Sequence, residues 1–91
     1  MQGSSVEIIR TERFRRAYRK LGTRQREQVK KALAQLLVDR AHPGLHVKRV
    51  QGTDTIWELL AGRTIRVTFE IETGAYVLRN VGHHDPTLMR P

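Results

Sequence analysis

Three places in the second half of the chain carry basic side chains or histidines of the types that suit reactions at phosphate groups. These places hold Lys48 and Arg49, then Arg66, then His83 and His84. Arginine can form two parallel hydrogen bonds to a phosphate and keeps its charge. Histidine, with an ordinary pKa of about 6.5, can give or take a proton near neutral pH. Together these residue types predict proton transfer at a phosphate, with no metal and no cofactor.

The charge of the chain points to an anionic partner. Seventeen Lys+Arg against nine Asp+Glu give the 91 residues a net charge of +8, and the pI is near 11.1. Residues 1–40 hold eleven Lys+Arg and four Asp+Glu, a difference of +7, whereas residues 41–91 hold six and five, a difference of +1. A nucleic acid is the first expectation and an acidic protein the second. A basic helical surface that only aids solubility is the alternative.

The composition also excludes several classes of protein. Without Cys there is no disulfide, thiolate metal site or Cys nucleophile, and a reducing, cytoplasmic location is expected. No apolar run approaches the roughly 18 residues of a membrane span, and Met1–Ser5 leads into a charged segment without the apolar core of a signal peptide. The length fits a single domain over residues 1–91.

The first half of the sequence predicts one strand and two helices. Residues 6–10 are apolar enough for a strand, with these inward side chains: Val6, Ile8 and Ile9. Thr11 can cap a helix that ends at Gly22, and Thr23 can cap a second helix that stops near Asp39. Helical spacing gives the two apolar faces: Phe14, Ala17, Tyr18 and Leu21, then Val29, Leu33, Leu36 and Leu37.

The second half changes to the alternation that is typical of strands. Four strands are expected, and the last three are joined by short Gly-containing links at 61–63 and 72–74. The strands are residues 47–50, 55–60, 64–71 and 75–81. In residues 64–71 the apolar side chains all face one way, which predicts one face on a core and one polar face. The fold class is therefore α+β, in the order β-α-α-β-β-β-β, with two N-terminal helices packed on one face of a mostly antiparallel sheet.

Strand parity gathers charged side chains on the polar face. Arg66 lies there, Arg79 joins it by the alternation of its own strand, and Glu58 comes from a neighbouring strand. His84 follows the last strand and can return over this face. Together they would form a cationic cleft that contains a carboxylate. Alternatively, Arg66 and Arg79 are ordinary cross-strand partners of Glu58 and Glu70.

Other interpretations stay open at three places. Lys48 and Arg49 are also explained as solvated charges of an edge strand. The His-His-Asp run at 83–85 suggests a metal site, but neighbouring side chains of an extended chain point opposite ways, so no metal is predicted. Trp57 is interpreted as part of the core rather than as a platform for a base.

The order of elements, the length and the charge resemble the RelE/ParE toxins of toxin–antitoxin systems, and three stretches add to this. Residues 42–52 (HPGLHVKRVQG) resemble the family segment in which a basic pair precedes a Gly. Residues 65–69 (IRVTF) resemble the strand signature of RelE-like proteins. Residues 78–85 (LRNVGHHD) resemble the last strand, which runs into a Gly and active-site residues. The resemblance covers roughly residues 6–90.

Ribonucleolytic members of this family bind the ribosomal A site and cut mRNA there, and the resemblance implies that activity. It implies catalytic roles for the basic pair Lys48 and Arg49, for the strand residue Arg66, and for His84 after the terminal Gly, with His83 beside it. The RelE pattern has an Arg and then a Tyr at this end, whereas this chain has two His and no Tyr. We therefore expect histidine-based chemistry, with the RNA 2′-OH as nucleophile and arginine stabilising the phosphorane.

The same resemblance and charge predict partners. RNA contacts are expected from these residues: Arg13, Arg16, Arg19, Lys20, Arg79 and His46, with His42 as the alternative to His46. The expected partners are a cognate acidic antitoxin, the ribosome and mRNA, without a membrane or a small-molecule cofactor.

Two other functions stay open. One is a ParE-like protein that inhibits DNA gyrase by binding alone, and the other is a non-toxic relative that binds only an antitoxin or RNA. The set of Lys48, Arg49, Arg66 and His84 favours the nuclease, because a pure binder has no need of it.

Overall fold

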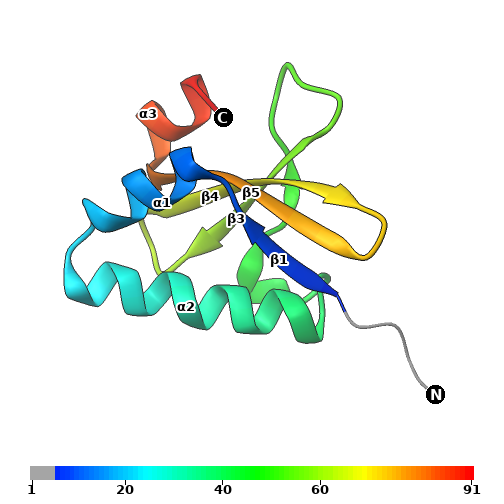
Figure 1. Cartoon of the computed structure of the whole chain (residues 1–91), viewed down its shortest axis with the longest axis horizontal. Helices are drawn as coiled ribbons and strands as arrows, with labels where there is room; N and C mark the ends of the chain where they lie inside the picture. Colours follow the sequence, from blue (N-terminus) through cyan, green and yellow to red (C-terminus); the bar gives the residue numbers. More distant parts are fainter. Residues whose placement is uncertain (1–5) are drawn as a thin grey trace.

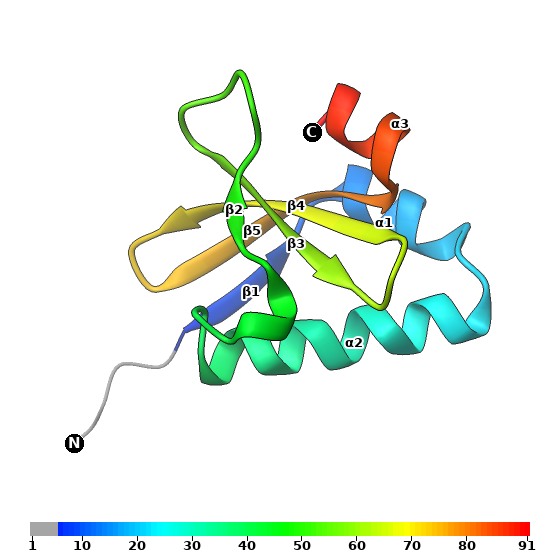
Figure 2. The ribbon, with the colours of Figure 1, turned by 180° about the vertical axis from the view of Figure 1, so that it is seen from behind.

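The computed structural model describes residues 6–91, which form a five-stranded sheet with helices on both of its faces (Figures 1 and 2). Met1–Ser5, where a signal peptide is not expected, lies outside the described residues. In this described part no helix is long and apolar enough to cross a membrane. The elements follow in this order: β1 (Glu7–Arg10), α1 (Glu12–Arg19), α2 (Thr23–Val38), the 3₁₀ turn η1 (Pro43–Leu45), β2 (Lys48–Arg49), β3 (Ile56–Ala61), β4 (Ile65–Glu72), β5 (Ala75–His83) and α3 (His84–Met89).

The strands lie in the order β1-β5-β4-β3-β2. β1 is parallel to β5, because α1 and α2 carry the chain from one edge of the sheet to the other before β2 begins. The remaining neighbours are antiparallel. Gly62 and Gly74 turn the chain between β3, β4 and β5 with φ of 68° and 71°, a region that favours glycine. The α+β class and the mostly antiparallel sheet are thus confirmed.

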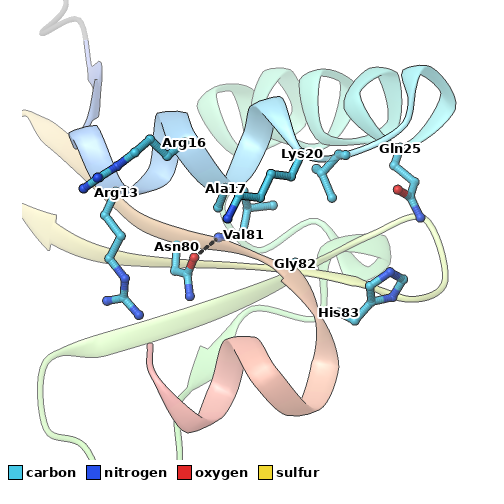
Figure 3. Close-up of a pocket in the computed structure, with 10 residues that line it drawn as sticks. Arg13, Arg16, Ala17, Lys20, Gln25, Asn80, Val81, Gly82 and His83 are labelled. Carbon is cyan, nitrogen blue, oxygen red and sulfur yellow. Dashed lines mark hydrogen bonds between the residues drawn. The ribbon is translucent and has the colours of Figure 1, made fainter.

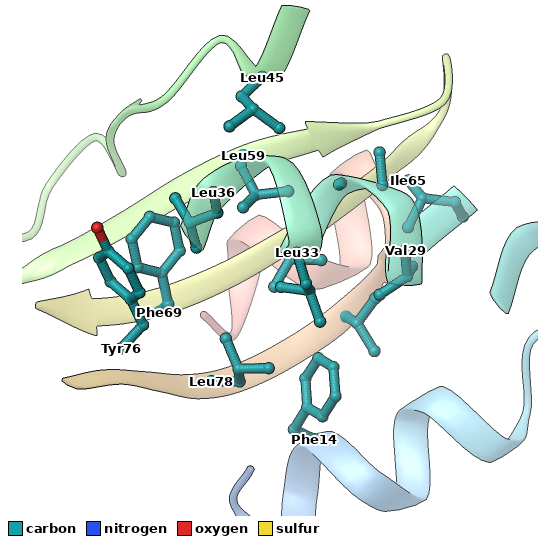
Figure 4. Close-up of a cluster of buried hydrophobic side chains, with 14 of the residues drawn as sticks. Phe14, Val29, Leu33, Leu36, Leu45, Leu59, Ile65, Phe69, Tyr76 and Leu78 are labelled. Atoms are coloured by element: carbon teal, nitrogen blue, oxygen red, sulfur yellow. The ribbon is translucent and has the colours of Figure 1, made fainter. Parts of the chain in front are cut away.

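The core lies between α2, α1 and one face of the sheet (Figure 4). Val29, Leu33 and Leu36 of α2 are buried, and Phe14 brings α1 into the same cluster. The sheet supplies alternate side chains from each long strand: Leu59, Ala61, Ile65, Val67, Phe69, Tyr76, Leu78 and Val81. The predicted apolar face of residues 64–71 therefore packs on the helices.

Thr11 fixes the start of α1 against the sheet. Its Oγ1 accepts a hydrogen bond from Phe14 N at 3.1 Å, as expected of an N-cap, and donates to Leu78 O of β5 at 2.7 Å. The prediction that Thr23 caps α2 is wrong. Gly22 already has extended backbone angles and is the N-cap, and its N donates to Gln25 Oε1 at 3.2 Å.

Three side chains expected in the core are exposed. Val6 and Ile9 are 40% and 43% exposed, because β1 is an edge strand and only Ile8 packs against the core. Leu37 is 46% exposed, since the buried face of α2 follows the spacing of Val29, Ala32, Leu33 and Leu36, which leaves Leu37 beside it. These three predictions are wrong.

A bulge in β5 changes which side chains face the core. Thr68 pairs with Asn80, whereas Phe69 pairs with Leu78, so Arg79 is an extra residue in β5. Leu78 before the bulge and Val81 after it both lie in the core. Arg79 and Asn80 therefore share the opposite, polar face. Beyond the bulge the alternation is reversed, and this decides where the last residues of β5 point.

Candidate functional site

The face of the sheet opposite α2 is polar, and α3 lies over it (Figures 1 and 2). Three of its side chains hold the backbone that follows α3. Thr68 Oγ1 donates to Pro91 O at 2.9 Å, and Arg79 Nε donates to the same oxygen at 3.2 Å. Asn80 Nδ2 donates to Arg90 O at 3.0 Å. α3 and the two residues after it are thus fastened across the polar face, although the predicted order of elements ends in a strand.

Arg79 is committed to these contacts. Besides the bond to Pro91 O, its guanidinium pairs with Glu70. The interpretation of Arg79 and Glu70 as cross-strand partners is therefore confirmed. A role of Arg79 in binding RNA stays a prediction, and it would require these bonds to open.

Gly82 lets α3 approach β5 closely. Thr87 of α3 is 2% exposed, and a Cβ built on Gly82 would lie 2.6 Å from its Oγ1. A side chain at position 82 would push α3 away from the sheet. Because His83 and His84 follow directly, the contact also fixes the start of α3.

Arg66 and Glu58 form the most buried ion pair of the described residues. Arg66 Nε lies 3.3 Å from Glu58 Oε1, and the two side chains are 21% and 4% exposed. They are diagonal neighbours, since Glu58 pairs with Thr68 and Arg66 with Leu60. A carboxylate this deep needs its partner, so Arg66 is held by its Nε. The cross-strand interpretation is again confirmed, and it does not remove Arg66 from the site.

Two adjoining cavities surround this pair. The first, of about 580 Å³, is lined by Lys48, Arg49, Glu58 and His84, with Leu88 of α3 at its side. The second, of about 360 Å³, is lined by Arg63, Arg66, His83 and His84 among others. His84 borders both, so the structure brings together all five residues predicted to be catalytic: Lys48, Arg49, Arg66, His83 and His84.

His84 is oriented by its neighbour in sequence. Its Nδ1 lies 2.8 Å from Asp85 Oδ1, and the imidazole side chain is 54% exposed. A carboxylate at Nδ1 favours the tautomer with the proton on Nδ1, which leaves Nε2 to accept a proton. The ring thus has one nitrogen occupied and one available to a bound molecule.

The two residues of the basic pair have different neighbours. Lys48 stands opposite Glu58 in the sheet, at the mouth of the first cavity. The Arg49 guanidinium lies 5.4 Å from the centre of the Trp57 ring, in a cation–π contact. Trp57 is partly buried and packs against the core, so its interpretation as a core residue is confirmed.

The other predicted RNA-binding residues lie in different places. Arg13, Arg16 and Lys20 line a groove between α1 and β5. Arg19 is outside that groove and lies 3.7 Å from Glu12. His46 is exposed at the end of η1 with φ of 48° and lines none of the cavities described above. His42 Nδ1 accepts from Gly44 N at 3.1 Å, which is a local loop contact.

Glu58 is the main functional candidate that the predicted set of site residues lacks. The pattern placed a carboxylate in the cleft, but only the structure shows it buried, paired with Arg66 and beside His84. Asp85 is the second, because its contact with His84 depends on the turn into α3. Among residues 6–91, no three His, Asp or Glu side chains are grouped in a way that could hold a metal ion.

Comparison with known proteins gives solved structures alone. No protein-family model matches the sequence, and no curated protein does. A doubly substituted E. coli RelE toxin in the free state superposes with a TM-score of 0.69 and 24% identity, over 90% of this chain and 86% of that one. RelE in the intact E. coli RelBE toxin–antitoxin complex gives 0.68 and 23%, over 89% and 99%.

The YoeB dimer from Staphylococcus aureus gives a TM-score of 0.73 at 7% identity, over 87% of this chain and 97% of that one. At these identities the likeness is one of fold. In these three comparisons it extends over at least 86% of either chain. The chain has the fold of the RelE-like toxins.

Proposed function

We propose that this chain is the toxin of a type II toxin–antitoxin system and that it cuts mRNA on the ribosome. One observation carries the proposal: Arg66, held by the buried Glu58, and His84, with Nε2 available, line one cavity. Such a pair supplies a fixed positive charge and a proton carrier at one point. The RelE-like fold and the excess of basic residues support the same function.

The proposed reaction uses the nucleophile that RNA itself carries. The 2′-oxygen attacks the adjacent phosphorus, the bond from phosphorus to the 5′-oxygen breaks, and a 2′,3′-cyclic phosphate forms. A proton leaves the 2′-OH and another reaches the departing 5′-oxygen, and His84 carries one of these transfers. Arg66 stabilises the charge of the five-coordinate phosphorus, with Lys48 and Arg49 binding the neighbouring phosphates.

The partner proposed for the inactive state is an acidic antitoxin. RelE in the E. coli RelBE structure is bound to its antitoxin, as are RelE proteins from Methanococcus jannaschii and Pyrococcus horikoshii in complexes with RelB. The net charge of +8 favours a partner with acidic side chains.

The test is cell-free translation combined with mapping of mRNA ends, using the full chain and two variants. Arg66→Ala and His84→Ala should each lower cleavage by about 10²–10³-fold or more, as expected for loss of an oxyanion donor or of a proton carrier. Arg24→Ala is the matched control, because Arg24 is an exposed arginine of α2 outside these cavities. It should cut at the wild-type rate.

The ends of the cut mRNA decide the mechanism. A 2′,3′-cyclic phosphate and a 5′-hydroxyl are expected, whereas 5′-phosphate ends would mean attack by water and overturn this chemistry. Inhibition of gyrase with translation spared would replace the proposal by the ParE-like function. Full toxicity of the Arg66→Ala/His84→Ala double variant would show that the protein acts by binding alone.

A further inference from the structure

A groove of about 490 Å³ runs between α1 and β5, outside the cavities of Arg66 and Lys48 (Figure 3). Arg13, Arg16 and Lys20 reach it from α1, and Gln25 from the start of α2. β5 forms its other wall, from Asn80 to His83. The groove therefore follows the strand that leads directly into the proposed catalytic residues.

The groove combines a cationic rim with an apolar floor. Three cations line it and no carboxylate does, whereas Ala17, Leu21 and Val81 supply apolar atoms. Arg16 lies 4.0 Å from Glu12, but both side chains are about two-thirds exposed, so solvent weakens this pair. Lys20 forms no ion pair within residues 6–91. An apolar floor beneath a basic rim fits a nucleoside whose phosphates contact the rim.

His83 and His84 connect this groove to the rest of the site. His83 lines both the groove and the Arg66 cavity, and His84 lines both the Arg66 cavity and the Lys48 cavity. The bulge at Arg79 causes this division, because it turns His83 toward the side of α1 while the chain bends into α3 at His84. The two histidines at the start of α3 are thus the residues that the three hollows share.

We propose that the groove between α1 and β5 is an RNA subsite that binds the strand on one side of the bond to be cut. The inference rests on the proposed function for its substrate class. It goes further by assigning Arg16 and Lys20 to the phosphates of the flanking nucleotide. An RNA strand that passes His83 and His84 can contact the groove and both cavities, because each histidine lines two of the three hollows. The basic side chains are spread over all three hollows, which matches the evenly spaced phosphates of an RNA strand better than an acidic peptide bound in the groove alone.

The experiment measures binding separately from cleavage. The full chain is titrated into a short fluorescent RNA with 2′-O-methyl riboses, which cannot be cut, and into the same RNA lengthened at its 5′ or its 3′ end. Arg16→Ala/Lys20→Ala removes two rim cations. Arg15→Ala/Arg24→Ala is the control, since both side chains are exposed and line none of the three hollows.

Lengthening the RNA at one end should raise the affinity of the wild type by about tenfold. The rim variant, Arg16→Ala/Lys20→Ala, should bind the short RNA as before and should lose this gain. For the longer RNA, the slope of log K against log salt concentration should become shallower by about 1.4 in the rim variant. Each phosphate contact to a single strand contributes about 0.7 to that slope, and two contacts are lost. The control should change both RNAs equally and slightly. Thermal unfolding of the two variants should match, because all four side chains are exposed.

Two outcomes would overturn the subsite. One is an equal loss for the rim variant and the control. The other is unchanged RNA binding with loss of binding to a glutamate-rich peptide, which would assign the groove to an acidic protein. If the rim variant loses the length-dependent binding but the wild type cuts no mRNA on ribosomes, the subsite is supported and the proposed function is refuted. The two proposals can therefore fail separately.

Discussion

The two faces of the sheet are covered by helices of very different kinds. On one face α1 and the sixteen residues of α2 lie over Val67, Phe69 and Leu78, each of them 0% exposed. On the other face the six residues of α3 bury one side chain, Thr87, and hydrogen bonds hold the two residues that follow. Apolar burial covers one face, and a few polar contacts cover the other.

This difference separates stability from function within one sheet. A buried Leu, Val or Phe contributes roughly 1.5–3 kcal/mol, whereas a hydrogen bond contributes about 0.5–1.5 kcal/mol. The α2 face should therefore hold the fold together, and α3 should open locally long before the sheet unfolds. The candidate catalytic residues Arg66 and His84 lie on the weakly covered face.

The largest expected difference between the two faces of the sheet should come from truncating two adjacent residues of β4 that face opposite ways. Phe69→Ala should lower the free energy of unfolding by about 3–5 kcal/mol, because it leaves a cavity under α2. Thr68→Ala removes the bond to Pro91 O and should cost about 1 kcal/mol. Urea denaturation of both variants measures the contrast. Equal losses would mean that the α3 face contributes as much as the core.

The next largest effect should appear in the reaction, with a positive charge kept beside the buried Glu58. Arg66→Lys keeps the charge but loses the planar fork, so it should not restore more than a small part of the cleavage that Arg66→Ala abolishes. The loss for Ala corresponds to about 2.7–4 kcal/mol of transition-state stabilisation. Single-turnover cleavage of ribosome-bound mRNA is the measurement. A lysine variant as fast as the wild type would reduce Arg66 to a simple counter-charge.

Alternation along the strands sufficed to place Arg66, because β4 is regular up to Thr68. The position of Glu58 on the polar face followed in the same way. Its burial did not, because that depends on which elements cover β3 at the edge of the sheet. The apolar stripe of α2 could be predicted from helical spacing as far as Leu36, which is 1% exposed, whereas Leu37 is 46% exposed.

The place of His83 could not be predicted from the sequence. An unbroken alternation puts it on the polar face with Arg79, but the bulge sends it to the side of α1. α3 was also missed, since six residues that include Pro86 give little helical pattern. Proline is tolerated in a first turn, where its missing N–H would have no partner. The contacts that fix α3 are long-range, so no local signal announces them.

A smaller effect is expected from Glu58→Gln, which changes how Arg66 is held and leaves the charge of Arg66 as it is. Glu58→Gln keeps the shape and an acceptor for Arg66 Nε, and it should lower the free energy of unfolding by about 1 kcal/mol, the difference between charged and neutral hydrogen bonds. Cleavage should slow by about tenfold with little change in RNA affinity. In the Arg66→Ala background the same change should have almost no further effect on cleavage. Additive losses would give Glu58 a role of its own.

The most local of these effects tests the α3 face alone. Gly82→Ala places a Cβ 2.6 Å from Thr87 Oγ1, so α3 must shift or detach. The cost should be about 1–3 kcal/mol, as for other overpacked sites, and it should be limited by the free energy that holds α3 in place. Hydrogen exchange should therefore speed up in residues 84–91, while the amides of α2 stay protected. Thr87→Ala removes the clashing oxygen, so the double variant should regain protection relative to Gly82→Ala. If α2 lost protection together with α3, the two faces would unfold as one unit, and the contrast between them would not hold.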